Sequence, residues 1–153
     1  MRQRRSDVTR ISQLSGAPPR CKPPRGATDT QTHTYRPGYR SAPGGLLVPT
    51  APPDAAEYRR VMAWLGLDRV VITQGAAHLR DNANLAVALA EMGDCARGGA
   101  VIDGATSEAD MQRLRDAGVR GARIMDLPGG AIGLAHLAEV DARAAVLGWC
   151  VAV

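Results

Sequence analysis

Short apolar runs alternate along the chain with segments in which apolar side chains recur every three or four residues. Short runs are typical of strands, and the three-to-four spacing is typical of a helix that buries one face. The pattern begins near residue 27 and continues to residue 153. It predicts strands at 27–35, 69–74, 98–103, 122–127 and 149–153.

A helix is predicted between each pair of successive strands, except that a Gly- and Pro-rich loop at 37–53 precedes the first helix. Gly66, Gly93 and Gly118 each follow a predicted helix, and glycine ends helices readily because it adopts a left-handed backbone conformation. Ser107 with Asp110 is typical of a capped helix start. The apolar faces of the four helices are Tyr58, Val61, Met62 and Leu65, then Leu85, Ala88, Leu89 and Met92, then Met111 and Leu114, and finally the segment 134–147.

The order of these elements is a repeated strand–helix unit. The runs show little polar alternation, so both faces of the strands are expected to be covered, as in an α/β fold whose parallel sheet has helices outside it. Two architectures fit: an open doubly wound sheet, or the first part of a TIM-like (β/α)8 barrel. Val153 ends the sequence inside an apolar run, and such a barrel needs about 250 residues. We therefore expect the amino-terminal part, about five strands, of a larger barrel.

Charge divides the chain into a basic flexible arm at 1–26 and a folded part at 27–153. The arm holds seven of the 19 Lys and Arg residues, whereas the whole chain has a net charge of +4. Four prolines and Asp7 disfavour an amphipathic helix in the arm, so a solvated tail is preferred to a transit peptide or an RNA contact. Because the folded part is not basic and the chain has few aromatic side chains, no nucleic-acid partner is expected.

Cysteine usage and hydropathy indicate the compartment. Cys21, Cys95 and Cys150 are far apart and contain no C-x-x-C pair, which argues against a disulfide scaffold and against a zinc cluster. A reducing compartment, and hence a cytoplasmic location, is expected. No apolar run is long enough to span a membrane, and no secretory signal is recognisable, so no membrane partner is expected.

Polar side chains gather where the predicted strands end, which is where parallel α/β proteins bind ligands. Gln31 and His33 lie two residues apart in the first strand and are expected on the same side. Gln74 ends the second strand, and His78 and Arg80 follow it in a loop. A ligand site is the functional interpretation of these residues. The alternatives are a hydrogen-bonded structural role for His33 and an ordinary surface loop for His78 and Arg80.

Arg123 lies among apolar residues in the fourth predicted strand, where an unpaired guanidinium would be costly. It therefore needs an anion. One interpretation is an internal ion pair with Asp103 or Asp126. The other is a substrate carboxylate, which the planar fork of arginine binds with two hydrogen bonds.

A metal site is not expected in the first strand. Histidines at both positions 31 and 33 would give the H-x-H spacing of a metal-binding strand, but Gln31 is a poor ligand for zinc. We therefore predict no metal and no other cofactor.

Several stretches together resemble the amidohydrolase-related family, in the branch of the 2-pyrone-4,6-dicarboxylate lactonases and of sugar-diacid lactone isomerases. The resemblance covers about residues 25–153. The stretches that carry it are Asp29 to Tyr35 (DTQTHTY), Pro37 to Tyr39 (PGY), Tyr58 to Arg60 (YRR), Trp64 to Gly66 (WLG), Gln74 and Gly75 with His78 and Arg80 to Asn82, and Gly121 to Gly130 (GARIMDLPGG).

The resemblance implies a metal-independent isomerisation or hydrolysis of a galactarolactone-like sugar-diacid lactone or another dicarboxylate. It implies that His33 is catalytic and that the substrate contacts Gln31, Gln74, His78, Arg80 and Arg123. Ala76 and Leu79 stand where the family has Asn and Gln, and these differences bear on substrate preference.

The resemblance also implies three more strands and an acid or base aspartate on the last of them. This chain alone is therefore expected to be inactive and to self-associate through open sheet edges. The alternative to an enzyme fragment is a non-catalytic α/β binding or interaction module whose basic arm contacts an acidic partner.

Overall fold

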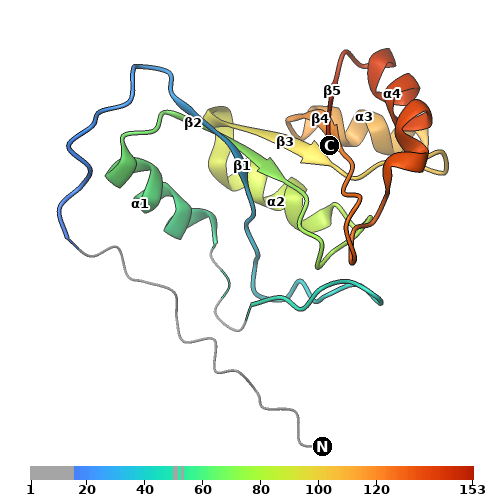
Figure 1. Ribbon diagram of the computed structural model, residues 1–153, viewed down its shortest axis with the longest axis horizontal. Coiled ribbons are helices and arrows are strands. Elements are labelled where there is room, and N and C mark those ends of the chain that lie inside the picture. Colours follow the sequence, from blue (N-terminus) through green and yellow to red (C-terminus); the bar gives the residue numbers. More distant parts are fainter. Residues whose placement is uncertain (1–15, 50–51, 53) are drawn as a thin grey trace, which may run out of the picture.

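Five parallel strands form one sheet within the residues that the structure describes, which are 16–49, 52 and 54–153 of a computed structural model (Figure 1). The elements are β1 (Thr28–Thr32), α1 (Ala55–Leu65), β2 (Arg69–Thr73), α2 (Ala83–Met92), β3 (Ala96–Ala100), α3 (Glu108–Asp116), β4 (Val119–Arg123), α4 (Leu137–Val146) and β5 (Cys150–Ala152), with short 3-10 helices at Gly93–Cys95 and Leu134–His136.

The strands follow one another in the sheet in the order β1-β2-β3-β4-β5. A doubly wound sheet reverses its strand order at a switch point, whereas a (β/α) barrel keeps the sequential order. Figure 1 shows α1 and α2 beside the first three strands, and α3 and α4 beside β4 and β5. The five strands therefore form half of a barrel, and the doubly wound alternative is excluded.

Two strands begin earlier than the hydrophobic pattern predicts. Strand β3 spans Ala96–Ala100 rather than 98–103, and β4 spans Val119–Arg123 rather than 122–127. The predicted boundaries were wrong because the apolar runs continue beyond the ends of the strands. At these positions, buried apolar side chains extend past the last residue that pairs with a neighbouring strand.

Glycine explains why the pattern missed the starts of these strands. A Cβ on Gly98 would lie 2.7 Å from Leu89 Cδ1 and 3.0 Å from Val119 Cγ2. Helix α2 and strand β4 thus pack directly on a backbone that carries no side chain. Ile102 and Ile124, which follow β3 and β4, are buried and supply the apolar signal that shifted the prediction.

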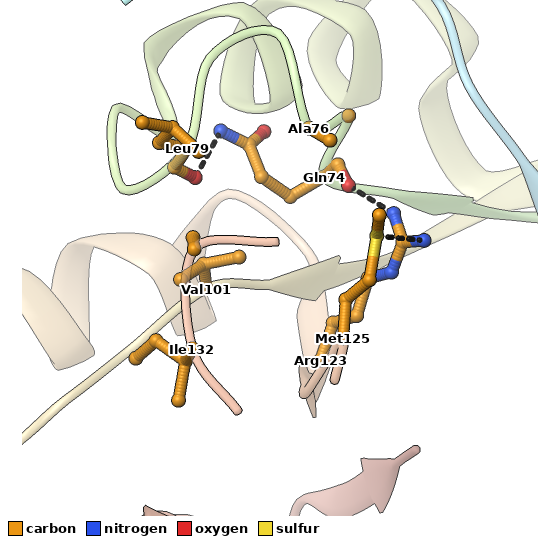
Figure 2. A pocket seen from close by; sticks show the side chains of 9 residues that line it. Gln74, Ala76, Leu79, Val101, Arg123, Met125 and Ile132 are labelled. Carbon is orange, nitrogen blue, oxygen red and sulfur yellow. Dashed lines mark hydrogen bonds between the residues drawn. The ribbon is translucent and has the colours of Figure 1, made fainter. Parts of the chain in front are cut away.

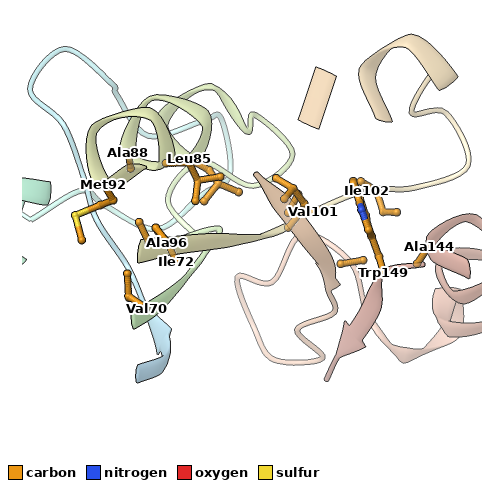
Figure 3. Close-up of a cluster of buried hydrophobic side chains, with 14 of the residues drawn as sticks. Val70, Ile72, Leu85, Ala88, Met92, Ala96, Val101, Ile102, Ala144 and Trp149 are labelled. Atoms are coloured by element: carbon orange, nitrogen blue, oxygen red, sulfur yellow. The ribbon is translucent and has the colours of Figure 1, made fainter. Parts of the chain in front are cut away.

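The core lies between the sheet and its helices. Figure 3 shows side chains of α2 packed on those of β2 and β3, and Trp149 beside Ile102 and Ala144. Full burial of a valine, leucine, isoleucine or methionine side chain stabilises a fold by roughly 1.5–3 kcal/mol. The core side chains contributed by α2, β2 and β3 include Val70, Ile72, Leu85, Ala88, Met92 and Ala96.

Strand β1 contains an irregularity that controls which way its polar side chains face. Asp29 is opposite Val70 and Thr32 is opposite Ile72, so β1 has one residue more than β2 in this interval. The Tyr58 hydroxyl of α1 donates a hydrogen bond to Asp29, and burial raises the pKa of Tyr58. Thr32 shares the side of the sheet of its partner Ile72, which belongs to the core beside α2. The next residue, His33, is therefore directed to the opposite, inner side, where it meets Arg123.

The chain before β1 is only partly described. Residues 1–15 of the predicted arm lie outside the described residues, and residues 16–26 follow an irregular path to β1. The Gly26 N–H donates a hydrogen bond to Asp68 (2.5 Å). None of the helices in the described part of the chain is both long and apolar enough to cross a membrane.

Candidate active site

The carboxyl ends of β1, β2 and β4 bring three predicted site residues together. His33 directly follows β1, Gln74 directly follows β2, and Arg123 ends β4. Arg123 Nη1 lies 3.5 Å from His33 Nε2 and donates to the Gln74 carbonyl oxygen at 2.5 Å. Residues distant in sequence thus meet at one edge of the sheet, as the parallel arrangement requires.

The hydrogen bonds of His33 fix the position of its ring proton. Nδ1 lies 2.9 Å from the Thr73 carbonyl oxygen, which can only accept, so Nδ1 carries the proton. Nε2 is left as an acceptor that faces Arg123. Burial lowers the pKa of His33, and the charge of Arg123 lowers it further, while the bond to Thr73 opposes them. The imidazole is therefore neutral and can accept a proton at Nε2.

Arg123 has no carboxylate partner among the described residues. Nη1 donates to the Gln74 carbonyl oxygen and Nη2 lies 3.3 Å from Met125 Sδ (Figure 2). The internal ion pair, one of the two interpretations of Arg123, is not formed. Asp103 pairs with Arg80 (2.8 Å), and Asp126 accepts from the backbone N–H of residue 134 (3.2 Å). Burial lowers the pKa of Arg123. A guanidinium has five N–H donors, so Arg123 keeps donors for an external anion.

The side chain of Gln74 organises the loop that follows β2. It is 2% exposed, and its Nε2 donates to the carbonyl oxygens of Leu79 (3.1 Å) and Asp81 (2.6 Å). Figure 2 shows the side-chain amide of Gln74 directed to this loop and the backbone carbonyl oxygen of Gln74 directed to Arg123. Leu79 has a φ of 49°, in the left-handed region that non-glycine residues rarely adopt. Gln74 therefore shapes the loop through its side chain and contacts Arg123 through its backbone.

His78 lies beneath the surface of this loop. It is 2% exposed, and its Nδ1 lies 3.2 Å from the Arg40 carbonyl oxygen. Its ring packs on Tyr35 with the ring centroids 5.7 Å apart. The His78 Nε2 atom is buried and has no hydrogen-bond partner in the described part of the chain. The alternative of an exposed loop position is therefore wrong for His78.

Two predicted site residues stand apart from this group. Gln31 is exposed, and its contact is a backbone N–H bond to Asp29 (3.0 Å). Arg80 is exposed and forms the ion pair with Asp103. The structure thus brings His33, Gln74 and Arg123 into direct contact, and His78 packs on the neighbouring Tyr35 ring. Gln31 and Arg80 lie outside these contacts.

Tyr35 belongs to the group although it was not among the predicted site residues. A Cβ on Gly75 would lie 3.0 Å from the Tyr35 hydroxyl, which shows how closely the ring covers the loop. Burial raises the pKa of Tyr35, and the charge of Arg123 opposes this shift. The sequence does contain a signal for Tyr35. The polar side chains at every second position, Gln31 and His33, continue to Tyr35, which places all three on one side of an extended segment.

A small pocket lies beside these residues (Figure 2). Its walls are mostly apolar, and Arg123 is the charged group in them. Within the described residues, no cluster of three or more His, Cys, Asp and Glu side chains could hold a metal ion. The residues that line the pocket are Gln74, Gly75, Ala76, Leu79, Val101, Arg123, Met125, Ala131 and Ile132.

Comparison with known families decides the assignment. The family model described as amidohydrolase matches residues 28–153. The chain belongs to the amidohydrolase family. This amidohydrolase chain is 54% identical over 144 residues to the D-galactarolactone isomerase of Agrobacterium fabrum strain C58, covering 94% of this chain and 49% of that protein. It is 34% identical over 143 residues to the 2-pyrone-4,6-dicarboxylate hydrolase of Comamonas testosteroni, covering 88% and 45%.

Solved structures have the same arrangement of strands and helices. An apo crystal structure from Agrobacterium tumefaciens superposes with a TM-score of 0.87 at 54% identity, covering 92% of this chain and 50% of that one. A probable 2-pyrone-4,6-dicarboxylic acid hydrolase from Acinetobacter baumannii, with citric acid bound, gives 0.71 at 18% identity over 82% and 48% of the two chains, which supports the fold alone. The amidohydrolase chain spans about half the length of the relatives it matches.

Proposed function

We propose that this amidohydrolase chain carries the carboxylate-binding part of a site that isomerises or hydrolyses a sugar-diacid lactone, such as a galactarolactone, without a metal ion. The observation that carries the proposal is the half-buried Arg123 guanidinium, which has no described carboxylate partner and lies beside the Nε2 atom of a neutral His33. Two relatives support the substrate class, since one is named as an isomerase of a sugar-diacid lactone and the other as a hydrolase of a cyclic dicarboxylate.

Isomerisation and hydrolysis of a lactone share their chemistry. In both, an oxygen attacks the lactone carbonyl carbon, the ring C–O bond breaks, and the proton of the attacking oxygen passes to the leaving oxygen. The attacking oxygen is a hydroxyl of the substrate in isomerisation and a water in hydrolysis. Arg123 would hold the free carboxylate of the substrate, and His33 Nε2 would accept a hydrogen bond, or the proton itself, from the attacking hydroxyl.

The donor set at this edge of the sheet does not fit a metal ion. Gln31 offers an exposed amide, and His33 Nδ1 is already bonded to a backbone carbonyl. The second nitrogen of His33 faces the Arg123 guanidinium at 3.5 Å, and this positive charge would repel a metal cation. No step of the proposed reaction therefore uses a metal ion.

Zinc binding tests this part of the proposal. After dialysis against a chelator, the chain is expected to bind zinc no more tightly than a surface histidine does, because His33 lacks a second ligand. Competition with a chromophoric chelator measures the affinity, and His33→Ala should leave it unchanged. His136→Ala is the matched control, since His136 is an exposed histidine. Stoichiometric zinc that survives chelator dialysis would contradict the prediction.

The carboxylate assignment is tested with a matched pair of ligands. D-galactarolactone carries a free carboxylate where D-galactonolactone carries a hydroxymethyl group. Titration calorimetry of the chain with each lactone should give binding of the first at least tenfold tighter than binding of the second, because only a carboxylate can pair with Arg123. Equal affinities, or no binding of either lactone at millimolar concentration, would rule out the proposed function.

Open strands support a proposal about partners. The outer edges of β1 and β5 are not paired with another strand of the described chain. Unpaired edges bind other strands, so we expect the chain to self-associate, with an average mass above that of the monomer in sedimentation velocity. A monomer across the micromolar range would contradict this.

A further inference from the structure

We propose that Tyr35 contacts the substrate of this site as a hydrogen-bond donor, and that Asn84 is the positioning residue that orients it. The inference rests on the proposed function, because the ligand is the one that Arg123 would hold. It adds an uncharged hydrogen-bond donor to the cationic donors of Arg123 and the acceptor of His33.

Tyr35 has the surroundings of a ligand-binding phenol. Its ring packs on His78 at an interplanar angle of 47°, and its hydroxyl lies over Gly75 at the edge of the site. No described residue hydrogen-bonds to this hydroxyl, although the charge of Arg123 acts on it. A half-buried phenol usually finds a hydrogen-bond partner, and a ligand oxygen beside Arg123 would supply one.

The protonation states of the neighbouring groups assign the role of donor to Tyr35. Neutral His33 has its proton on Nδ1, which donates it to the Thr73 carbonyl oxygen. Its Nε2 can therefore only accept. Burial raises the pKa of Tyr35, so the phenol keeps its proton at neutral pH. Tyr35 therefore supplies an uncharged donor for a carboxylate or lactone oxygen, while His33 supplies the acceptor for a hydroxyl.

Asn84 holds the backbone on both sides of Tyr35. This side chain is 3% exposed and comes from the first turn of α2. Its Nδ2 donates to the Thr34 carbonyl oxygen at 2.8 Å, and its Oδ1 accepts from the Arg36 N–H at 3.0 Å. Both ends of one amide are thus bonded to the peptide groups that flank Tyr35. A buried side chain with this geometry fixes the direction of the Tyr35 side chain.

Gly75 makes the position of Tyr35 adjustable by experiment. An alanine Cβ there would lie 3.0 Å from the Tyr35 hydroxyl and 3.1 Å from a ring carbon. Gly75 does not have a positive φ, so alanine is compatible with its backbone. Gly75→Ala is therefore expected to push the ring away from the loop with little strain of the backbone itself.

The test measures the affinity of Tyr35→Phe for D-galactarolactone, with Tyr39→Phe as the matched control from the same loop. Loss of the Tyr35 hydroxyl should weaken binding about tenfold, and loss of the Tyr39 hydroxyl should change it less than twofold. Gly75→Ala should weaken binding in the same direction. In the wild-type chain labelled with ¹³C-tyrosine, the ligand should shift the Tyr35 signal and leave the Tyr58 signal unmoved.

The outcomes separate this inference from the proposed function. If the wild-type chain prefers D-galactarolactone to D-galactonolactone, but Tyr35→Phe and Tyr39→Phe bind it alike, the role of Tyr35 is disproved and the proposed function stands. If the wild-type chain shows no preference, both proposals fall. Weaker binding by Tyr35→Phe with an unchanged ¹³C signal in the wild-type chain would also count against direct contact.

Discussion

Replacement of Arg123 by lysine is expected to weaken the binding of D-galactarolactone by about 30- to 150-fold, or about 2 to 3 kcal/mol. Lysine keeps the positive charge, so the loss measures the geometry of the guanidinium. Arg123 donates to the Gln74 carbonyl oxygen and retains further N–H groups for a carboxylate. A single ammonium cannot bond that carbonyl and both oxygens of a carboxylate in one plane.

Titration calorimetry of the wild-type chain and of Arg123→Lys measures the difference. Arg120→Lys is the matched control, because Arg120 lies on the same strand and is exposed. Its side chain donates to the backbone carbonyl oxygens of Arg115 and Val119. Its affinity should stay within twofold of the wild-type value. Unchanged binding by Arg123→Lys together with a lower melting temperature would assign Arg123 to the stability of the fold instead.

Local sequence signals predicted the elements well where side chains act on their own backbone. Gly66 ends α1 with a φ of 79°, and its N–H bonds to the Met62 carbonyl oxygen at 2.8 Å. The Ser107 side chain accepts from the Asp110 N–H at 3.1 Å at the start of α3. These contacts span three or four residues, so the residue types alone are sufficient to predict them.

The details of the site could not be predicted because they depend on backbone atoms and on long-range placement. Every residue has a carbonyl group, so nothing in the sequence indicates that the carbonyl of Thr73 bonds His33 and that of Gln74 bonds Arg123. From the sequence, Asp103 is as good an ion-pair partner for Arg123 as for Arg80. The path of the loop that places Arg80 beside Asp103 decides between them. The additional residue in β1 has no local signature either, and it decides the face to which His33 is directed.

Replacement of Asn84 by alanine is expected to lower the free energy of unfolding by about 2 to 3 kcal/mol. The change leaves the Thr34 carbonyl oxygen and the Arg36 N–H without their partner. Urea denaturation measures the loss. Gln112→Ala is the control, since Gln112 is an exposed amide whose bond to Asp116 lies on the surface of α3, and it should cost less than 0.5 kcal/mol, a value of about the size expected for surface sites.

Asn84→Asp separates the loss of hydrogen bonds from the loss of volume, because the two side chains have nearly the same shape. A carboxylate can still accept from the Arg36 N–H, but it repels the Thr34 carbonyl oxygen that the amide of Asn84 bonds at 2.8 Å. The folded state would therefore raise the pKa of the new carboxyl. Relative to the wild-type chain, this variant should lose stability at neutral pH and regain it as the pH falls through the raised pKa, because the protonated carboxyl can donate to Thr34. A stability difference independent of pH would show that Asn84 contributes through packing and does not act by holding the backbone around Tyr35.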